Sequence, residues 1–203
     1  MKFILLILLL PINIYAENVD LSVAIRNHKR VLKSLGHEKL NPIQLRFKSY
    51  LDKKAEGKMP NRMLNYFAKR PRLLFGFKNS VNFAENYSKK ICKINKRPIN
   101  DEADALRHLL WSSYLTQKFG AKVAFEITAL QETRQEELDD SSKMDIFNNY
   151  QAISKYKRRF KRSKSSNKSR MIKFSLDLLE SGNVKVLVSK KSGCQNSILY
   201  PNF

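Results

Sequence analysis

Residues 101–115, DEADALRHLLWSSYL, combine side chains that can transfer protons with side chains that can hold a substrate. Asp104 precedes His108 by four residues, so on a helix the two share one face with Trp111. An aspartate at this spacing can accept the N–H of the imidazole, which selects its tautomer and raises the basicity of the other nitrogen. We therefore predict catalytic roles for Asp104 and His108, and a dry wall or stacking surface for a ring substrate at Trp111.

The same spacing also arises by chance in amphipathic helices. On that interpretation the histidine and the aspartate form a buried pair that only fixes helix packing, and removing one partner lowers the stability of the fold. Both interpretations are compatible with residues 101–115 alone.

Two later segments, ALQETRQEE and MDIFNNYQA, favour a functional site. Glu132 lies beside an apolar stripe, and a half-buried glutamate can have a raised pKa and act as an acid. Asp145 offers a further carboxylate. Asn148 and Asn149 follow it, and asparagine is unfavourable inside helices. This pair could bind a substrate, ligate a hard cation or cap a neighbouring helix.

Three motifs occur in order, and together they resemble a bacterial helical domain of unknown function associated with phage-linked and toxin-linked proteins. The motifs are Asp-x-x-Arg-His-x-x-Trp from Asp104, Thr-Ala-x-x-Glu ending at Glu132, and Met-Asp-x-x-Asn-Asn ending at Asn149. The similarity covers about residues 101–152, and residues 175–187 resemble the C-terminal end of that domain. The resemblance implies one shared pocket, built by Asp104, Arg107, His108, Glu132, Asp145 and Asn149, and it implies no known activity.

The chain departs from this pattern at four positions. Gln131 and Phe147 stand where we expect histidines, and Ala152 and Ile153 stand where a glycine is usual. Without two histidines the set suits acid/base chemistry better than tight zinc binding, so we predict neither a metal nor another cofactor. A degenerate, inactive copy of the domain stays a possible interpretation.

The N-terminus has the layout of a secretory signal peptide. Lys2 precedes an apolar run over residues 3–10, Pro11 breaks it, and Ala16 offers a cleavage site. The run is shorter than the roughly 20 residues of a transmembrane helix. We expect residues 1–16 to be removed and the mature chain, residues 17–203, to be a periplasmic or secreted single domain without a transmembrane segment.

The charge predicts an anionic partner. The chain carries a formal net charge of +21, and residues 155–173 hold ten Lys or Arg and no acid. Such charge attracts cell-wall polymers, anionic lipids or nucleic acid through counterion release. Within this basic segment we predict that the polyanion is bound by Arg158, Arg159, Lys161 and Arg162.

Only two cysteines are present, Cys92 and Cys194. In an oxidising compartment an even pair predicts a disulfide, which would tie the C-terminal tail to the segment before residues 101–119. Two separate buried thiols are the alternative.

Apolar spacing predicts a mainly α-helical domain with at most a short C-terminal strand or hairpin. Four regions follow one another: N-terminal helices over 17–97, a site core over 98–152, the basic segment 155–173, and a C-terminal helix, strand and tail over 174–203. Helices are expected at 20–35, 42–56, 60–69, 78–93, 101–119, 121–137, from 144, and at 170–180. Asn100 is the expected N-cap of the fifth, Gly120 its end, and 183–188 the best strand candidate.

These observations predict an exported hydrolase that acts on an anionic polymer, with cell-wall glycan before nucleic acid. Glu132 would act as the acid, Asp145 or Asp104 as the second carboxylate, and Arg107, Trp111, Asn148 and Asn149 would hold the substrate. For nucleic acid, His108 would act as the general base. The alternative is a non-enzymatic cationic protein that binds cell wall, anionic lipid or nucleic acid.

Overall fold

A computed structural model describes residues 20–36, 39–96, 98–133, 138–160, 167–187 and 194. The predicted signal peptide, Lys161 and Arg162 lie outside these residues. The described part forms seven helices: α1 (Leu21–Leu35), α2 (Pro42–Ala55), α3 (Asn61–Lys69), α4 (Leu73–Cys92), α5 (Glu102–Gln131), α6 (Asp140–Arg159) and α7 (Lys168–Glu180). The mainly α-helical prediction is confirmed.

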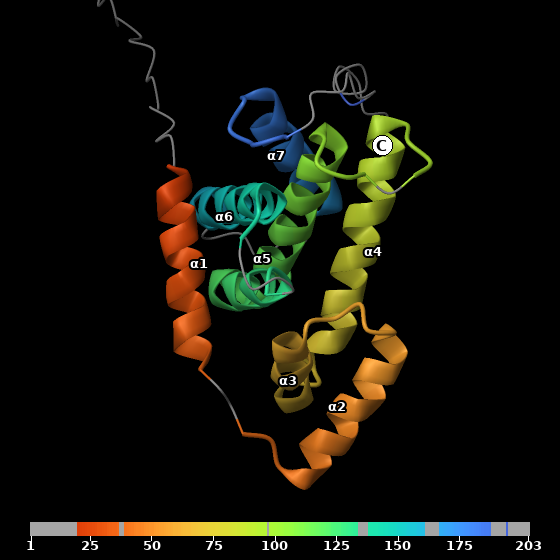
Figure 1. Ribbon diagram of the computed structural model, residues 1–203. Coiled ribbons are helices and arrows are strands. Elements are labelled where there is room, and N and C mark those ends of the chain that lie inside the picture. Colours follow the sequence, from red (N-terminus) through yellow and green to blue (C-terminus); the bar gives the residue numbers. More distant parts are fainter. Residues whose placement is uncertain are drawn as a thin grey trace, which may run out of the picture.

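Helix α5 is the centre of the fold. Figure 1 shows α4, α6 and α7 around it, with α1 along one side of α5 and α6. The apolar residues of α5 are buried on more than one face, and Leu106, Leu109, Leu110 and Leu115 are among the fully buried side chains. A helix buried on several sides holds its polar residues in fixed positions, because neighbouring helices pack against each of them.

Gly120 divides α5 into two straight parts, as its sequence predicts. Its φ of 83° and ψ of 161° are outside the helical range, and other L residues rarely adopt this positive φ. The first part carries the 101–115 stretch, and the second part ends at Gln131. The predicted break at Gly120 is thus confirmed, as a kink between the two parts of α5. The second part ends at Gln131, before the predicted end at residue 137.

The N-cap of α5 is Asp101, not Asn100. The Asp101 carboxylate accepts the backbone N–H of Asp104 at 2.9 Å. Asn100 takes a left-handed conformation with a φ of 59° and donates its own backbone N–H to Asp104 at 2.7 Å. Its side-chain oxygen accepts a hydrogen bond from Ser141 at 2.7 Å, which joins the starts of α5 and α6.

The described part of the predicted C-terminal strand, residues 183–187, is not a strand. Leu187 donates its backbone N–H to the Asn100 carbonyl at 3.0 Å, and Lys185 exchanges two hydrogen bonds with the Asn148 side chain. These bonds satisfy the backbone without a partner strand, which a β-ladder requires. Alternating β-branched residues therefore form an irregular segment against α5 and α6.

Cys92, at the end of α4, forms a disulfide with Cys194, as predicted. Both residues are buried. Among the described residues, no helix is both long and apolar enough to span a membrane.

Candidate active site

His108 lies at the meeting point of α5 and α6, and both of its ring nitrogens have polar neighbours. Its Nδ1 lies 3.2 Å from Asn149 Oδ1, and its Nε2 lies 3.1 Å from Asp145 Oδ1. The ring is almost completely buried. His108 of α5 thus contacts two residues of α6, Asp145 and Asn149, which follow it by 37 and 41 positions in the chain.

Asn149 and Ser112 lie beside Nδ1 of His108. Asn149 Oδ1 accepts the hydroxyl hydrogen of Ser112 at 2.7 Å and lies 3.2 Å from His108 Nδ1. With this oxygen as the acceptor, Nδ1 donates its hydrogen to Asn149. The other nitrogen, Nε2, lies 3.1 Å from Asp145 Oδ1 and 2.8 Å from Arg107 Nη2.

The predicted hydrogen bond from His108 to Asp104 is wrong. The nearest oxygen of Asp104 lies 3.7 Å from His108 Nε2. That oxygen is instead taken by Arg107, which bonds it through both Nε and Nη2, while the second oxygen accepts the Asn100 backbone N–H. The carboxylate is occupied because an arginine at i+3 offers several donors in a fork, which a single imidazole N–H cannot match.

The charges around His108 favour its protonated form. Burial lowers the pKa of His108, and the charge of Arg107 lowers it further. The carboxylates of Asp145 and Asp104 outweigh both effects and hold the pKa of His108 above its ordinary value. The nearby carboxylates therefore favour the imidazolium form of His108, and the imidazole and Asp145 meet at 3.1 Å as a pair of titratable groups.

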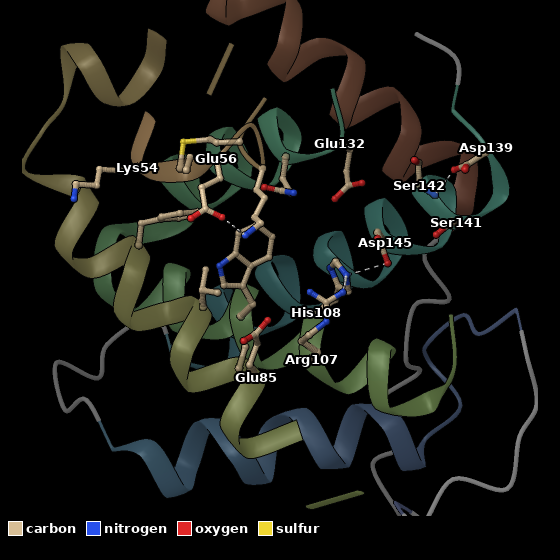
Figure 2. Close-up of a pocket in the computed structure, with 18 residues that line it drawn as sticks. Lys54, Glu56, Glu85, Arg107, His108, Glu132, Asp139, Ser141, Ser142 and Asp145 are labelled. Carbon is tan, nitrogen blue, oxygen red and sulfur yellow. Dashed lines mark hydrogen bonds and ion pairs between the residues drawn. The ribbon is translucent and has the colours of Figure 1, made fainter. Parts of the chain in front are cut away.

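A cavity of about 560 Å³ opens at this pair. Its walls come from the end of α2, from α4, from the first part of α5, from the residues after α5 and from the start of α6. Figure 2 shows the carboxyl group of Glu132 on the same side of the cavity as His108 and Asp145. Glu132 is half-buried, as predicted. Glu132 and His108 thus face one cavity.

Acids outnumber bases among the charged residues that line the cavity. Its acidic residues are Glu56, Glu85, Glu132, Asp139 and Asp145, and its basic residues besides His108 are Lys54, Lys58 and Arg107. Lys58 pairs with Glu56 at 2.7 Å, and Arg107 pairs with Asp104 beneath the floor. A strongly cationic chain thus surrounds a cavity with a local excess of carboxylates.

Trp111 lines the cavity, but it lies within the wall. Only 5% of the residue is exposed, and its indole N–H donates to Ser80 Oγ at 3.0 Å. Its ring meets His108 edge to face, with centroids 6.2 Å apart. Of its two predicted roles, the dry wall agrees with this burial, and an open stacking platform does not.

Asn148 and Asn149 lie behind the cavity, and neither belongs to its lining. The Asn148 side chain is fully buried and forms two hydrogen bonds of 2.9 Å with the backbone of Lys185. The predicted contact of Asn148 and Asn149 with a substrate stays a prediction, and in the structure both side chains make contacts within the protein. Asn148 anchors the segment after α7, and Asn149 orients His108.

Ligating atoms of Asp104, His108 and Asp145 lie within 4.8 Å of one another, which is close enough to hold a metal ion. The Arg107 guanidinium contacts two of these groups, because its Nη2 bonds Asp104 and lies 2.8 Å from His108 Nε2. A metal would have to displace this positive charge. The positive charge that balances the Asp104 carboxylate is therefore the Arg107 guanidinium.

The basic segment is only partly described. Arg158 and Arg159 are exposed in the last turn of α6. Arg159 Nη1 lies 3.1 Å from an oxygen of Asp177 in α7. At least one of the four predicted polyanion contacts is therefore already engaged with an acid of the same chain.

Sequence reasoning missed two residues of the site. Ser112, one turn after His108, hydrogen-bonds Asn149 Oδ1 at 2.7 Å, and its i+4 spacing from His108 was the available signal. Glu85 lines the cavity from α4. No motif marks Glu85, since its position depends on how α4 packs against α5.

Comparison with curated proteins and comparison with solved structures find no match. A family model does match, over residues 64–183, which include most of α3, all of α4 to α7, and the residues that contact the His108 ring. Its description is a domain of unknown function, DUF6973. This match covers more than half of the chain, and the chain therefore belongs to the DUF6973 family.

Proposed function

We propose that this protein is an exported hydrolase that cleaves a polymer by general acid/base chemistry in the His108 cavity, with cell-wall glycan as the first substrate class and nucleic acid as the second. One observation carries the proposal: a buried histidine–aspartate pair opens into a cavity that a second carboxyl group, Glu132, also faces. Converging titratable groups in a concave site are the usual physical basis of hydrolysis.

The residues divide the chemistry between them. His108 positions the carboxylate of Asp145 at the cavity, where Asp145 takes a proton from water or attacks the substrate. Glu132 is half-buried and supplies the proton to the leaving oxygen. Asn149 and Ser112 hold the imidazole in one orientation from behind. Arg107 neutralises Asp104 and brings positive charge to the floor.

The acidic lining favours a glycan over nucleic acid. A phosphodiester that enters the cavity would meet five carboxylates against Lys54, Lys58, Arg107 and His108, and the excess of carboxylates repels its negative charge. Glycosidic bonds are neutral, and their hydrolysis uses two carboxyl groups. The net charge of +21 acts outside the cavity, where it would retain the protein on an anionic wall. A toxin-linked or phage-linked protein that attacks walls would suit this chemistry.

The non-enzymatic cationic binder is the second candidate, and the burial of Trp111 favours it. A platform that is 5% exposed offers a sugar ring almost no stacking surface. On this interpretation the histidine–aspartate pair stabilises the joint between α5 and α6, and the surface charge alone holds the polymer.

The test is incubation of the purified mature protein with cell wall, DNA, RNA and phospholipid, with and without a chelator, followed by analysis of soluble fragments. We expect soluble glycan fragments from the wall. Asp145→Asn and Glu132→Gln should each lower the rate by about 10²–10⁴-fold, the usual contribution of one acid or base. Glu180→Gln, the same type of change at an exposed position of α7, is the matched control.

Two results would decide against the hydrolase. If no polymer is cleaved while wall retention is strong, the binder is the better description. If fragments appear but Asp145→Asn and Glu180→Gln release them equally fast, the activity belongs to another site.

A further inference from the structure

Helix α2 exposes apolar side chains that no other described element covers. Ile43 is 78% exposed, Leu45 49% and Tyr50 56%, and Leu51 is the one buried residue of the helix. Figure 1 shows α2 at the edge of the molecule, next to α3 and apart from the helices around α5. Moreover, α2 precedes residues 64–183 and is not part of the family match. Packing within the chain therefore does not explain its outer face.

The outer face of α2 mixes apolar and cationic groups in a helical order. Ile43 and Tyr50 are exposed at i and i+7, and between them half-buried Phe47 packs against the core and stacks on Tyr50 with ring centroids 6.2 Å apart. Lys54 continues this line, with its Nζ 6.0 Å from the centre of the Tyr50 ring.

Cations border the apolar line on its outer side. At 100° per residue, Arg46 and Lys53 project next to Tyr50 and away from buried Leu51. The helix holds four Lys or Arg and a single acid, Asp52. Long aliphatic stems allow lysine and arginine to keep their charges at a polar boundary while their methylene groups enter an apolar layer.

We propose that α2 docks on the surface of an anionic lipid bilayer, with Ile43 and Tyr50 in the headgroup boundary and Arg46 and Lys53 on lipid phosphates. A helix with an aliphatic and aromatic line flanked by cations is the usual form of a surface-bound membrane helix. Each lysine or arginine near an anionic leaflet contributes about 1 kcal/mol to binding, and Tyr suits the interface because its ring is apolar and its hydroxyl polar.

The bilayer accounts for this face better than two other occupants. A second copy of the chain would also carry a net charge of +21, so the two cationic faces would repel each other. A nucleic acid would use the cations, but it would leave Ile43 without an apolar partner. Only a layer with anionic headgroups above hydrocarbon uses both kinds of side chain.

Docking would also place the His108 cavity at the membrane surface. The end of α2 and the turn after it line this cavity through Lys54, Glu56 and Lys58. A bilayer against α2 would therefore lie beside one wall of the cavity. The proposal does not depend on hydrolysis, because the binding surface and the titratable groups are different residues.

The test is co-sedimentation of the full mature protein with phosphatidylglycerol vesicles and with phosphatidylcholine vesicles. We expect binding to the former and little to the latter. Ile43→Ser with Tyr50→Ser should weaken the partition coefficient by about 10- to 100-fold, since each side chain loses part of an apolar burial. Arg46→Gln with Lys53→Gln should weaken it by about 25-fold, from about 1 kcal/mol per cation.

Matched controls change the same residue types elsewhere. Ile99→Ser alters another exposed isoleucine, and Lys29→Gln with Lys33→Gln removes two exposed charges from α1. The partition coefficients of these control variants should stay within about twofold to threefold of the value for the unchanged protein. The proposal fails if the protein does not sediment with anionic vesicles, or if the α2 variants and the controls weaken binding equally. It also fails if a concentration-dependent dimer forms and Ile43→Ser with Tyr50→Ser abolishes it, because the face would then hold a second copy.

Discussion

His28 should make the fold sensitive to acid. This histidine of α1 is buried, as its place on the apolar stripe of α1 predicts, and it lines a small cavity of about 20 Å³ together with Asn149. Burial, together with the charges of Lys29 and Arg62, lowers the pKa of His28 to about 4. The folded protein therefore keeps His28 neutral at a pH where the unfolded chain binds a proton.

The size of the effect follows from the two pKa values. The unfolded chain takes up a proton at His28 below pH 6.5, whereas the folded protein does so only near pH 4, so falling pH favours unfolding between these values. Each pH unit in that window contributes 1.36 kcal/mol. At pH 4.5 the loss of unfolding free energy from His28 should reach about 2.5 kcal/mol relative to pH 7.

His28→Gln tests this directly, since glutamine is polar but cannot be protonated. Urea unfolding is measured at pH 7 and pH 4.5 for the unchanged protein, for His28→Gln and for Lys33→Gln, an exposed control on α1. Protonation of carboxylates changes the unfolding free energy equally in all three proteins, so this contribution cancels in the comparison. His28→Gln should lose about 2–3 kcal/mol less than the other two proteins. Equal losses in all three would refute the reasoning.

Three further predictions concern other parts of the molecule. Reducing the disulfide of Cys92 and Cys194, which are 102 residues apart, should lower the unfolding free energy by about 4–5 kcal/mol, and calorimetry with and without reductant should show a lower melting temperature. Asn148→Ala should speed amide exchange in residues 183–187, whereas unchanged exchange would show that its two hydrogen bonds do not hold this segment. Activity should fall as pH rises through the raised pKa of His108, and Asp145→Asn should move that fall to lower pH in a pH–rate profile.

The helices could be predicted because their signals are local. Asn41 and Gln44 form a capping box at the start of α2, and the glycines after α1 and within α5 adopt positive φ. These residues act on their own backbone within one turn, so the sequence around each position contains the whole cause. The shift of the α5 cap from Asn100 to Asp101 is a choice between two adjacent residues that can both cap, and packing against Ser141 decides it.

The contacts of the site could not be predicted as well, because they depend on competition between partners. Spacing correctly places Asp104 and His108 on one face, but it does not show that Arg107 takes the carboxylate first. Asp145 replaces Asp104 beside the imidazole only because α6 crosses α5 at this point. Helical periodicity identifies which residues face inward and leaves open which of them meet.

The same distinction between local and global causes applies to charge. A net charge of +21 favours attraction to any polyanion at a distance, but salt screens this field within about 8–10 Å at physiological ionic strength. Inside the cavity only nearby groups matter, and there carboxylates outnumber the basic side chains. Substitution of surface cations should therefore change retention on a polymer, while substitution of Asp145 should change its cleavage. A single substitution that changed both to the same degree would mean that binding and chemistry use one surface, and the division between cationic exterior and acidic cavity would then have no functional meaning.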